Sequence, residues 1–589
     1  MKEPLSFYQN QLELHEAQEK ALNKQLKGLS VLRLLVFLAL CFGVYLSLPN
    51  WNVAILTGLV GLGCFLFLLV KYTNLKHKRN LEKAIADLNA EEIKIITNGF
   101  LDRDTGIEFQ EPAHAYSLDI DLFGRGSFFQ CINRTFIREG KQKLADALKA
   151  NNIEHINLRQ QAIQELADKA VWRQHYGGVS SLIQVETPAK TINAWLSGYQ
   201  VKLPGYYKIL PAIFAVISVL LGALVFINIL SPNYLGLWLL VGLVLTGLHL
   251  KTINLIATQT DKLKETFKQY GVLLDLIEKE QFEAPLLVEK QRLIMDEGEK
   301  ASVVFSQLSR LLDRLDNRNN LISAVFGNGL FLLDIKNTYA IEQWIKKHAL
   351  KTTDWFEVIS FFDAYNALGN YAFNHPEYVY PEIINTGTVM EVKQLGHPLL
   401  KTEKRIDNNF SIKPEQFFII TGANMAGKST FLRTVSLHMV MANVGLPVCA
   451  KSSKYYPMKL ITSMRTNDSL TDDSSYFFSE LTRLKHIVDA IQTERYFIVL
   501  DEILKGTNST DKAIGSRKFV EKLVASNATG IIATHDLSLC EISDELSEVE
   551  NYYFDAEIVN DELYFDYTFK SGICQNMNAS FLLKKMEII

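Results

Sequence analysis

The chain has 589 residues, enough for several domains, and its hydrophobic content of 48% is at the upper end for a soluble protein. The formal net charge is only −4, and no basic tail or stripe of Lys and Arg supports a nucleic-acid surface. The six Cys residues lack metal-type spacing, so we expect reduced or core thiols and no zinc site.

The first predicted element is a transmembrane helical hairpin at residues 31–72. No charged residue occurs from Leu34 to Val70, and the sequence LPNWN interrupts this stretch midway. A single helix spans a bilayer with about 20 residues, so an unbroken helix would overshoot the hydrocarbon. The sequence therefore predicts a turn at Pro49. A pair of buried helices in a soluble protein is the alternative.

Two amphipathic, charged segments flank this hairpin and predict helices that pair with each other. We assign residues 1–30 to a cytoplasmic helix and residues 73–100 to a helical stalk. Lys and Arg occur at the outer ends of the hairpin, whereas its turn carries no charge. The positive-inside rule therefore places both outer ends in the cytoplasm.

A second transmembrane hairpin is predicted at residues 204–252. No Asp, Glu, Lys or Arg occurs from Ile209 to Leu250, and the sequence SPNY lies at the centre of this stretch. With the first hairpin this gives four transmembrane helices and predicts a multi-pass protein of the cell (inner) membrane. From Thr258 to Arg318 the chain is rich in charged residues with few helix breakers, which predicts long helices.

The motif TGANMAGKST follows the apolar run from Phe417 to Ile420 and precedes a helix-like stretch that ends near Gly445. Its spacing fits the P-loop template, in which backbone N–H groups surround phosphates. We predict a buried parallel strand, a phosphate-binding loop, and a helix whose N-terminus faces the anion. An accidental Gly/Ser turn is the alternative. The predicted nucleotide-binding residues are Gly422, Ala423, Asn424, Met425, Ala426, Gly427, Lys428, Ser429 and Thr430.

Two further apolar strands end in polar residues that can complete this site. The run from Tyr496 to Leu500 leads into Asp501 and Glu502. We predict that Asp501 holds Mg²⁺ together with the Ser429 hydroxyl, and that Glu502 orients the attacking water. The stretch GIIATHD ends near His535, which is predicted to contact the terminal phosphate or the water; a loop histidine is the alternative. The predicted catalytic residues are Lys428, Glu502 and His535, and the predicted cofactors are ATP and Mg²⁺.

Several of these stretches resemble the MutS mismatch-repair ATPases. The resemblance is carried by TGANMAGKST, DEILKGTNSTD, SSYFFSEL, GHPLL and ATHD, and upstream by YSLDIDLFGRGSFFQCINRT, RQQAI and FFDAYNALGNYAFNHPEYVYPEI. It implies a multidomain protein with an α-helical MutS-like core at residues 101–203 and 253–388, which the second hairpin interrupts. It also implies a C-terminal α/β P-loop ATPase domain of the ABC type at residues 389–589. The family further implies a homodimer in which Ser475 completes the ATP site of the partner chain.

The chain also departs from the family pattern. Ala423 and Ala426 replace a Pro and a Gly, while Leu504 and Lys505 replace a Gly and an Arg. The methyl group of Ala426 fits only if that residue keeps a negative φ. No aromatic residue occurs around Arg405 and Ile406, where the family's adenine-stacking aromatic would fall. We therefore expect base stacking to be aliphatic or to come from elsewhere in the chain.

The motifs and the apolar hairpins together predict a membrane-anchored MutS-like ATPase that binds and hydrolyses ATP. Binding of duplex DNA is implied by the resemblance alone. The first hundred residues are occupied by the hairpin and its stalks, so we expect no mismatch-reading N-terminal domain and only weak, mismatch-indifferent DNA binding. The sequence FQE at residues 109–111 fits the family's Phe-x-Glu wedge but lies at the edge of the core. The alternative is an ATP-driven transporter or scaffold without a DNA role, although the spans lack charges that would mark a substrate path. Partners among other repair proteins are not predicted.

Overall fold

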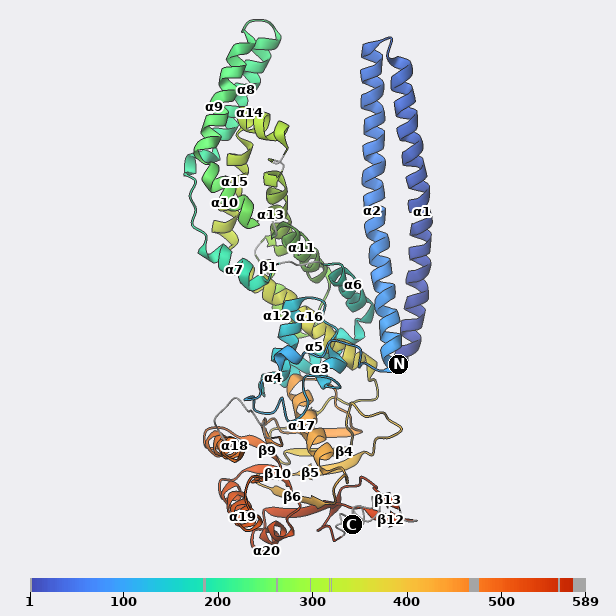
Figure 1. Cartoon of the computed structure of the whole chain (residues 1–589), viewed down its shortest axis with the longest axis vertical. Coiled ribbons are helices and arrows are strands. Elements are labelled where there is room, and N and C mark those ends of the chain that lie inside the picture. Colours follow the sequence, from blue (N-terminus) through green and yellow to red (C-terminus); the bar gives the residue numbers. More distant parts are fainter. Residues whose placement is uncertain are drawn as a thin grey trace.

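The computed structural model describes residues 3–183, 187–260, 263–296, 298–316, 318, 320–465, 476–559 and 562–575. The molecule is elongated (Figure 1). Two helical hairpins lie at one end, a helical region lies in the middle, and an α/β region that contains the C-terminal part of the chain lies at the opposite end. The predicted multidomain, largely helical architecture with a C-terminal sheet is confirmed at this level.

The first hairpin consists of two long antiparallel helices, α1 (Pro4–Ser47) and α2 (Trp51–Asn98). Each helix continues without a break from the predicted stalk into the apolar tip (Figure 1). The turn at residues 48–50 falls where Pro49 predicts it. His15 Nδ1 lies 2.6 Å from Glu82 Oε2, so the two stalks pair as expected.

The apolar side chains at the tip of this hairpin face outward, including Leu34, Phe37 and Phe67. A buried helix pair in a soluble protein would cover them, so this alternative does not fit. Among the helices in the described part of the chain, α1 and α2 are both long and apolar enough to cross a membrane.

The second hairpin is shorter than predicted. It comprises α8 (Leu210–Phe226) and α9 (Pro232–Leu248), each of 17 residues, and turns around Ser231 as expected. Asn228, with a φ of 58°, lies just beyond the end of α8. The chain bends by 63° between α9 and α10 (Leu250–Thr260), and this pair makes at most a third span by length and composition. Helix length therefore does not support the predicted four spans.

The middle region is built around α16 (Thr352–Asn374), which is buried over most of its length. The remaining helices of this region are α3 (Phe128–Ile132), α4 (Arg138–Lys149), α5 (Ile156–Asp168), α6 (Ala170–Ser181), α7 (Ala189–Gly198), α11 (Leu263–Lys279), α12 (Pro285–Arg292), α13 (Ala301–Asp316), α14 (Asn328–Phe331) and α15 (Leu333–His348). A β-hairpin of β1 (Met295–Asp296) and β2 (Glu299–Lys300) interrupts the helices predicted between Thr258 and Arg318. Phe109 of the FQE sequence is partly buried and packs edge-on against the core residue Phe129, with ring centroids 5.6 Å apart.

Buried polar groups attach the first hairpin to α16. Glu92 of α2 is buried and forms an ion pair with Arg134. The Glu92 carboxylate also accepts hydrogen bonds from Asn370 Nδ2 and Asn374 Nδ2 of α16, each at 3.1 Å. The Tyr8 hydroxyl of α1 donates to Asn374 Oδ1 at 2.7 Å. Both helices of the hairpin therefore contact the same end of α16.

The C-terminal region contains a six-stranded sheet in the order β14-β11-β6-β10-β9-β8, parallel except for β14. Its strands are β6 (Phe417–Gly422), β8 (Lys459–Ser463), β9 (Tyr496–Asp501), β10 (Thr529–Ala533), β11 (Val549–Phe554) and β14 (Lys570–Ser571). The strands predicted before the loop, before Asp501 and before His535 are therefore confirmed as adjacent central strands.

Helices and a second sheet surround these strands. The helices are α17 (Lys428–Val444), α18 (Tyr476–Ala490), α19 (Ser509–Ala525) and α20 (Ile542–Glu545). The second sheet has the order β3-β7-β4-β5, formed by Glu382–Ile383, Ser452–Tyr455, Met390–Leu395 and Asn408–Ile412, and a small hairpin joins β12 (Glu557–Val559) to β13 (Glu562–Tyr564). The predicted helix after the motif is confirmed as α17.

Candidate functional site

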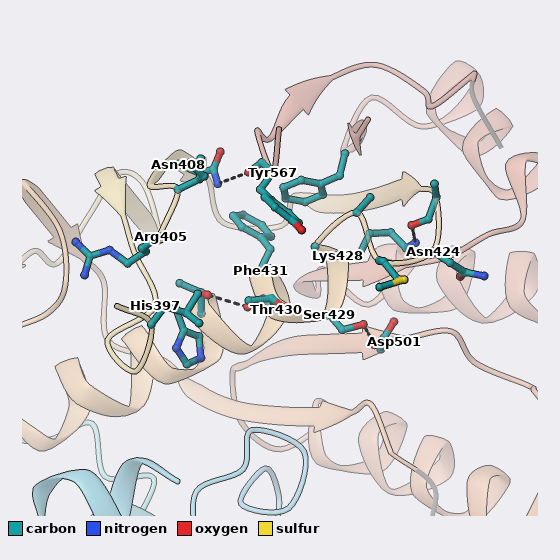
Figure 2. A pocket seen from close by; sticks show the side chains of 18 of the residues that line it. His397, Arg405, Asn408, Asn424, Lys428, Ser429, Thr430, Phe431, Asp501 and Tyr567 are labelled. Carbon is teal, nitrogen blue, oxygen red and sulfur yellow. Dashed lines mark hydrogen bonds between the residues drawn. The ribbon is translucent and has the colours of Figure 1, made fainter. Parts of the chain in front are cut away.

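A cavity of about 730 Å³ lies where β6 and β9 end and α17 begins (Figure 2). The loop from Ala423 to Gly427 forms one wall, and Lys428, Ser429, Asp501, Glu502 and His535 also line it. Residues predicted from three separate motifs therefore meet at one place. They do so because parallel strands present their carboxyl ends at the same edge of a sheet.

The loop between β6 and α17 needs glycine at both ends. Gly422 has a φ of 150°, and a Cβ atom there would lie 2.6 Å from Phe554 O. Gly427 has a φ of 104°. Ala426, in contrast, keeps a negative φ and is fully buried, so its methyl group is accommodated as the sequence analysis required. The exposed Met425 adopts a left-handed conformation with a φ of 67°.

Lys428 is held against the loop that precedes it. Its Nζ donates to Gly422 O at 2.6 Å and to Ala423 O at 3.0 Å, and it lies 3.4 Å from His535 Nε2. Burial lowers the pKa of Lys428, while the nearby Asp501 carboxylate opposes this shift. The ammonium group and the N-terminus of α17 are thus directed at the same cavity, an arrangement that suits an anion.

Ser429 and Asp501 form a hydroxyl–carboxylate pair beside Lys428. Ser429 Oγ donates to Asp501 Oδ2 at 2.6 Å (Figure 2). Both groups offer the oxygen ligands that Mg²⁺ prefers, and Mg²⁺ commonly takes one or two protein ligands and completes its shell with water and phosphate. One hydroxyl and one carboxylate oxygen at 2.6 Å from each other therefore fit Mg²⁺ in this mode.

The predicted catalytic carboxylate, Glu502, is engaged by a lysine. Glu502 has a φ of 51°, and its Oε1 accepts a hydrogen bond from Lys512 Nζ at 2.6 Å. Burial alone would raise the pKa of Glu502, but the hydrogen bond and charge of Lys512 outweigh this effect and lower it. Burial, together with the charge of Lys428, lowers the pKa of His535, so its imidazole is neutral at pH 7. The sequence analysis did not single out Lys512.

The segment after Glu502 is held by the buried Glu480. Leu504 N donates to Glu480 Oε1 at 2.6 Å, and Lys505 N donates to Glu480 Oε2 at 3.1 Å. Leu504 has a φ of 60°, the left-handed region that favours glycine, and its side chain is buried. The replacement of the family's glycine therefore keeps the backbone conformation and adds an apolar side chain to the core.

This conformation predicts an unusual order of stability at position 504. Leu504→Gly should melt at a higher temperature than Leu504→Ala, because a side chain in the left-handed region costs roughly 1–2 kcal/mol that glycine avoids. Melting temperatures of the full chain in detergent test this. At Leu523, buried inside α19, the order should reverse, because Gly is about 1 kcal/mol worse than Ala in a helix. The same order at both positions would contradict the prediction.

An aromatic side chain enters the cavity from a segment that sequence reasoning missed. Tyr567 lies next to the loop, and a Cβ atom on Gly427 would be 3.0 Å from Tyr567 Cδ1. Its backbone oxygen accepts a hydrogen bond from Asn408 Nδ2 at 3.0 Å (Figure 2). Around Arg405 and Ile406 no aromatic residue is present, as expected, and Arg405 pairs with Asp407 at 2.6 Å. The aromatic wall therefore comes from elsewhere in the chain.

The helical core reaches the end of β8 through Asp119, a second residue whose role the sequence did not reveal. The buried Asp119 carboxylate accepts hydrogen bonds from Thr462 Oγ1 at 2.5 Å, Met464 N at 3.1 Å and Arg465 N at 2.9 Å. Asp119 lies in the YSLDIDLF stretch, and the resemblance of this stretch to the MutS family is the one feature of the sequence that could have pointed to it. Ser475, predicted to act on a partner chain, lies outside the described residues.

Together these features define the C-terminal region as an α/β domain whose strand–loop–helix junction is built to bind an anion. Residues 418–585 match the family MutS domain V. MutS protein homolog 4 of Homo sapiens is 34% identical over 224 residues, which cover 36% of this chain and 23% of the relative. The DNA mismatch repair proteins MutS of Persephonella marina and Methanococcoides burtonii are 34% and 30% identical over 197 and 230 residues, covering 32% and 38% of this chain.

The C-terminal part of the chain, residues 418–585, is therefore a MutS domain V, as the motifs predict. The matched stretch spans 23%, 22% and 26% of these three relatives, so the chain covers about a quarter of their length.

Proposed function

We propose that the chain is a membrane-anchored ATPase of the MutS type, in which residues 422–430 are a P-loop that binds the phosphates of ATP. The observation that carries this proposal is the contact between Ser429 Oγ and Asp501 Oδ2, next to Lys428 at the N-terminus of α17. A lysine, a hydroxyl and a strand-end carboxylate in this arrangement are the groups that P-loop proteins use for phosphate and Mg²⁺.

The roles of the side chains follow from their positions. Lys428 and the loop N–H groups bind the terminal phosphates, and Ser429 and Asp501 hold Mg²⁺, which neutralises phosphate charge when bound. Glu502 orients the attacking water, and His535, neutral and beside Lys428, donates or accepts a hydrogen bond at the terminal phosphate. Because Lys512 engages Glu502 in this structure, hydrolysis requires that ion pair to open. Tyr567 is the aromatic wall available for base stacking.

Both hairpins lie in the cell (inner) membrane in this proposal, with the helical core and the ATPase domain in the cytoplasm. The outward-facing apolar side chains of both hairpins and the Lys and Arg residues at their outer ends support it. Helices α8 and α9, with 17 residues each, are at the lower limit of about 17 to 25 residues that can cross the hydrocarbon.

The ATPase rate of the full chain in detergent, with and without duplex, mismatched or branched DNA, tests the proposal. We expect Mg²⁺-dependent hydrolysis of ATP that changes when DNA is added, because the MutS relatives are named as DNA mismatch repair proteins. If none of these DNAs changes the rate of ATP hydrolysis, the result would favour the alternative of an ATP-driven transporter or scaffold. No hydrolysis under any of these conditions would refute the ATPase.

DNA binding should be weak, sensitive to salt and indifferent to mismatches. The net charge is −4, and Phe109, the wedge candidate, is packed against the core. Contacts with phosphate groups do not distinguish one base from another. A protein that binds duplex DNA through roughly 6 to 10 such contacts loses a factor of about 10³ to 10⁵ in DNA affinity when the salt concentration rises from about 50 to 200 mM. Isotherms on matched and mismatched duplexes at these salt concentrations test this. If the protein bound the mismatched duplex about tenfold more tightly, a difference of about 1.4 kcal/mol, it would contain a structural element that recognises mismatched bases.

The active form is a homodimer in which Ser475 completes the site of the partner chain. Mixing inactive Lys428→Ala and Ser475→Ala chains should restore part of the ATPase rate, because each mixed dimer contains one site with neither substitution. Subunit exchange before the assay is checked with two affinity tags on the two chains. A mixture that exchanges subunits but stays inactive would contradict shared sites.

A further inference from the structure

An apolar segment that belongs to neither hairpin lies between α13 and α15. From Asn320 to Leu333 it contains no Asp, Glu, Lys or Arg. It forms a π-helical turn (Ser323–Gly327) followed by α14 and a left-handed Leu332. An apolar stretch of roughly 10 to 14 residues is too short to span a bilayer, and belongs either to a buried core helix or to a re-entrant or interfacial segment.

The exposure of its side chains separates these two possibilities. Leu321 is 78% exposed, Ile322 is 70% exposed and Phe326 is 53% exposed. A core helix would bury such residues, and a monomeric soluble protein rarely exposes a contiguous apolar patch of this kind. The second hairpin, which α14 contacts, also carries outward-facing apolar side chains, such as Val219, which is 62% exposed. The segment therefore has the surface of a membrane element.

Its contacts with the second hairpin are of the type found between helices in lipid. α14 packs against both α8 and α9 (Figure 1). A Cβ atom on Gly242 of α9 would collide with Gly329 O of α14, so the two backbones approach as closely as glycines allow. Small residues at such contacts are a feature of membrane helix packing, where close backbone approach replaces the hydrophobic effect.

A side chain of the second hairpin hydrogen-bonds the backbone of the segment. Ser218 Oγ, halfway along α8, donates to Leu330 O at 2.6 Å and accepts from Trp238 Nε1 at 2.8 Å. Asn328 Nδ2 donates to Asp334 Oδ2 at 2.9 Å, so the first ionisable residue after the segment is paired. Non-helical backbone is tolerated at membrane depth only where protein groups meet its hydrogen bonds in this way.

We propose that residues 320–333 form a re-entrant segment that enters the membrane from the side of the helical core and reaches mid-depth beside the second hairpin. Leu321, Ile322 and Phe326 contact lipid acyl chains, while Gly329 and Leu330 face α9 and α8. The proposal rests on the proposed membrane insertion of the second hairpin. It gives the core a third attachment to the bilayer, because α13 and α15 lead directly into and out of the segment.

Spin-label accessibility in the full chain tests the proposal. The native Cys residues are replaced, and a nitroxide is attached to a single Cys at Ile322 or Phe326, in vesicles of phosphatidylethanolamine and phosphatidylglycerol. Collision rates are measured with oxygen, which concentrates in the hydrocarbon, and with a water-soluble nickel chelate. Val219 on α8 reports on the hairpin itself. Leu350, which is 85% exposed beyond the far end of α15, is the aqueous control.

The expected result is a high oxygen and low nickel collision rate at Ile322, Phe326 and Val219, with the opposite order at Leu350. Nickel access at Ile322 and Phe326 together with a lipid signal at Val219 would overturn the re-entrant segment and leave the membrane hairpin intact. Nickel access at Val219 as well would overturn both. Low rates with both reagents at Ile322 would show that protein covers the segment, which also overturns the contact with lipid.

Discussion

Lys428→Ala should weaken ATP binding by about 10² or more, whereas Glu502→Gln should bind ATP normally and hydrolyse it about 10² to 10⁴ times more slowly. The two effects differ because, in the proposed site, Lys428 contacts phosphate in the ground state, and losing a charged hydrogen bond there costs affinity. Glu502 acts on the water, so its loss appears mainly in the rate. Isothermal titration with ATP and steady-state hydrolysis separate the two quantities.

Two control variants sharpen this test. Lys518→Ala removes an exposed lysine on α19, away from the cavity, and should change neither quantity. Lys512→Met removes the partner of Glu502 and should leave ATP affinity unchanged while it alters the pH dependence of the rate, because the pKa of Glu502 rises once Lys512 no longer opposes the effect of burial. Equal loss of ATP affinity in Lys428→Ala and Glu502→Gln would show that the roles assigned to them are wrong.

Glu92→Ala should produce the largest loss of stability outside the ATPase domain. The substitution leaves the Arg134 guanidinium buried without its carboxylate, and removing one partner of a buried ion pair costs about 3–5 kcal/mol. Asn370 and Asn374 of α16 lose an acceptor at the same time. We expect a lower melting temperature and faster protease cleavage where α2 joins the core. Lys94→Ala on the same helix breaks an exposed pair with Asp102 and should have neither effect.

The Glu92 carboxyl group also predicts that the fold loses stability at acidic pH. Burial alone would raise the pKa of Glu92, but the charge and hydrogen bond of Arg134 outweigh it and lower the pKa below 4.5. A carboxyl whose pKa is lower in the folded than in the unfolded state stabilises the fold fully above about pH 4.5 and loses this contribution as the pH falls through the folded-state pKa. Glu92→Gln should therefore flatten the acid limb of the stability curve, and an unchanged limb would contradict this assignment.

The elements that the sequence predicts well are those fixed by local chemistry. Continuous apolar runs correctly predicted β6, β9 and β10, and Pro and Asn residues correctly predicted the positions of the turns in both hairpins. The lengths of the helices in the two hairpins were less predictable. An absence of charge does not show where a helix ends, and nothing in the apolar run marks the 63° bend after α9. The β-hairpin at Gly298, with a φ of 91°, was missed because helix-forming residues surround it.

The residues of the candidate site likewise fall into those that the sequence predicted and those that it did not. Motif spacing was enough to predict Lys428 and Ser429 at the loop, and the position of Asp501 at the end of an apolar strand was enough to predict the third group, because parallel strands present their carboxyl ends at the same edge of a sheet. Tyr567 at the cavity and Asp119 at the end of β8 were missed because each is placed by a tertiary contact with a residue more than a hundred positions away. The segment at residues 320–333 was missed for a different reason. Its apolar run is short, and only its exposure distinguishes it from a core helix.

Both hairpins project from one end of the molecule, while the ATPase domain forms the other end (Figure 1). This polarity restricts the symmetry of a dimer that pairs through its ATPase domains. If the two-fold axis runs along the bilayer normal, both subunits stand in one membrane. If the axis lies parallel to the membrane plane, the hairpins point in opposite directions and the dimer tethers two facing membranes. For the proposed membrane-anchored dimer, the direction of this one symmetry axis would therefore decide whether the two subunits share one membrane or join two.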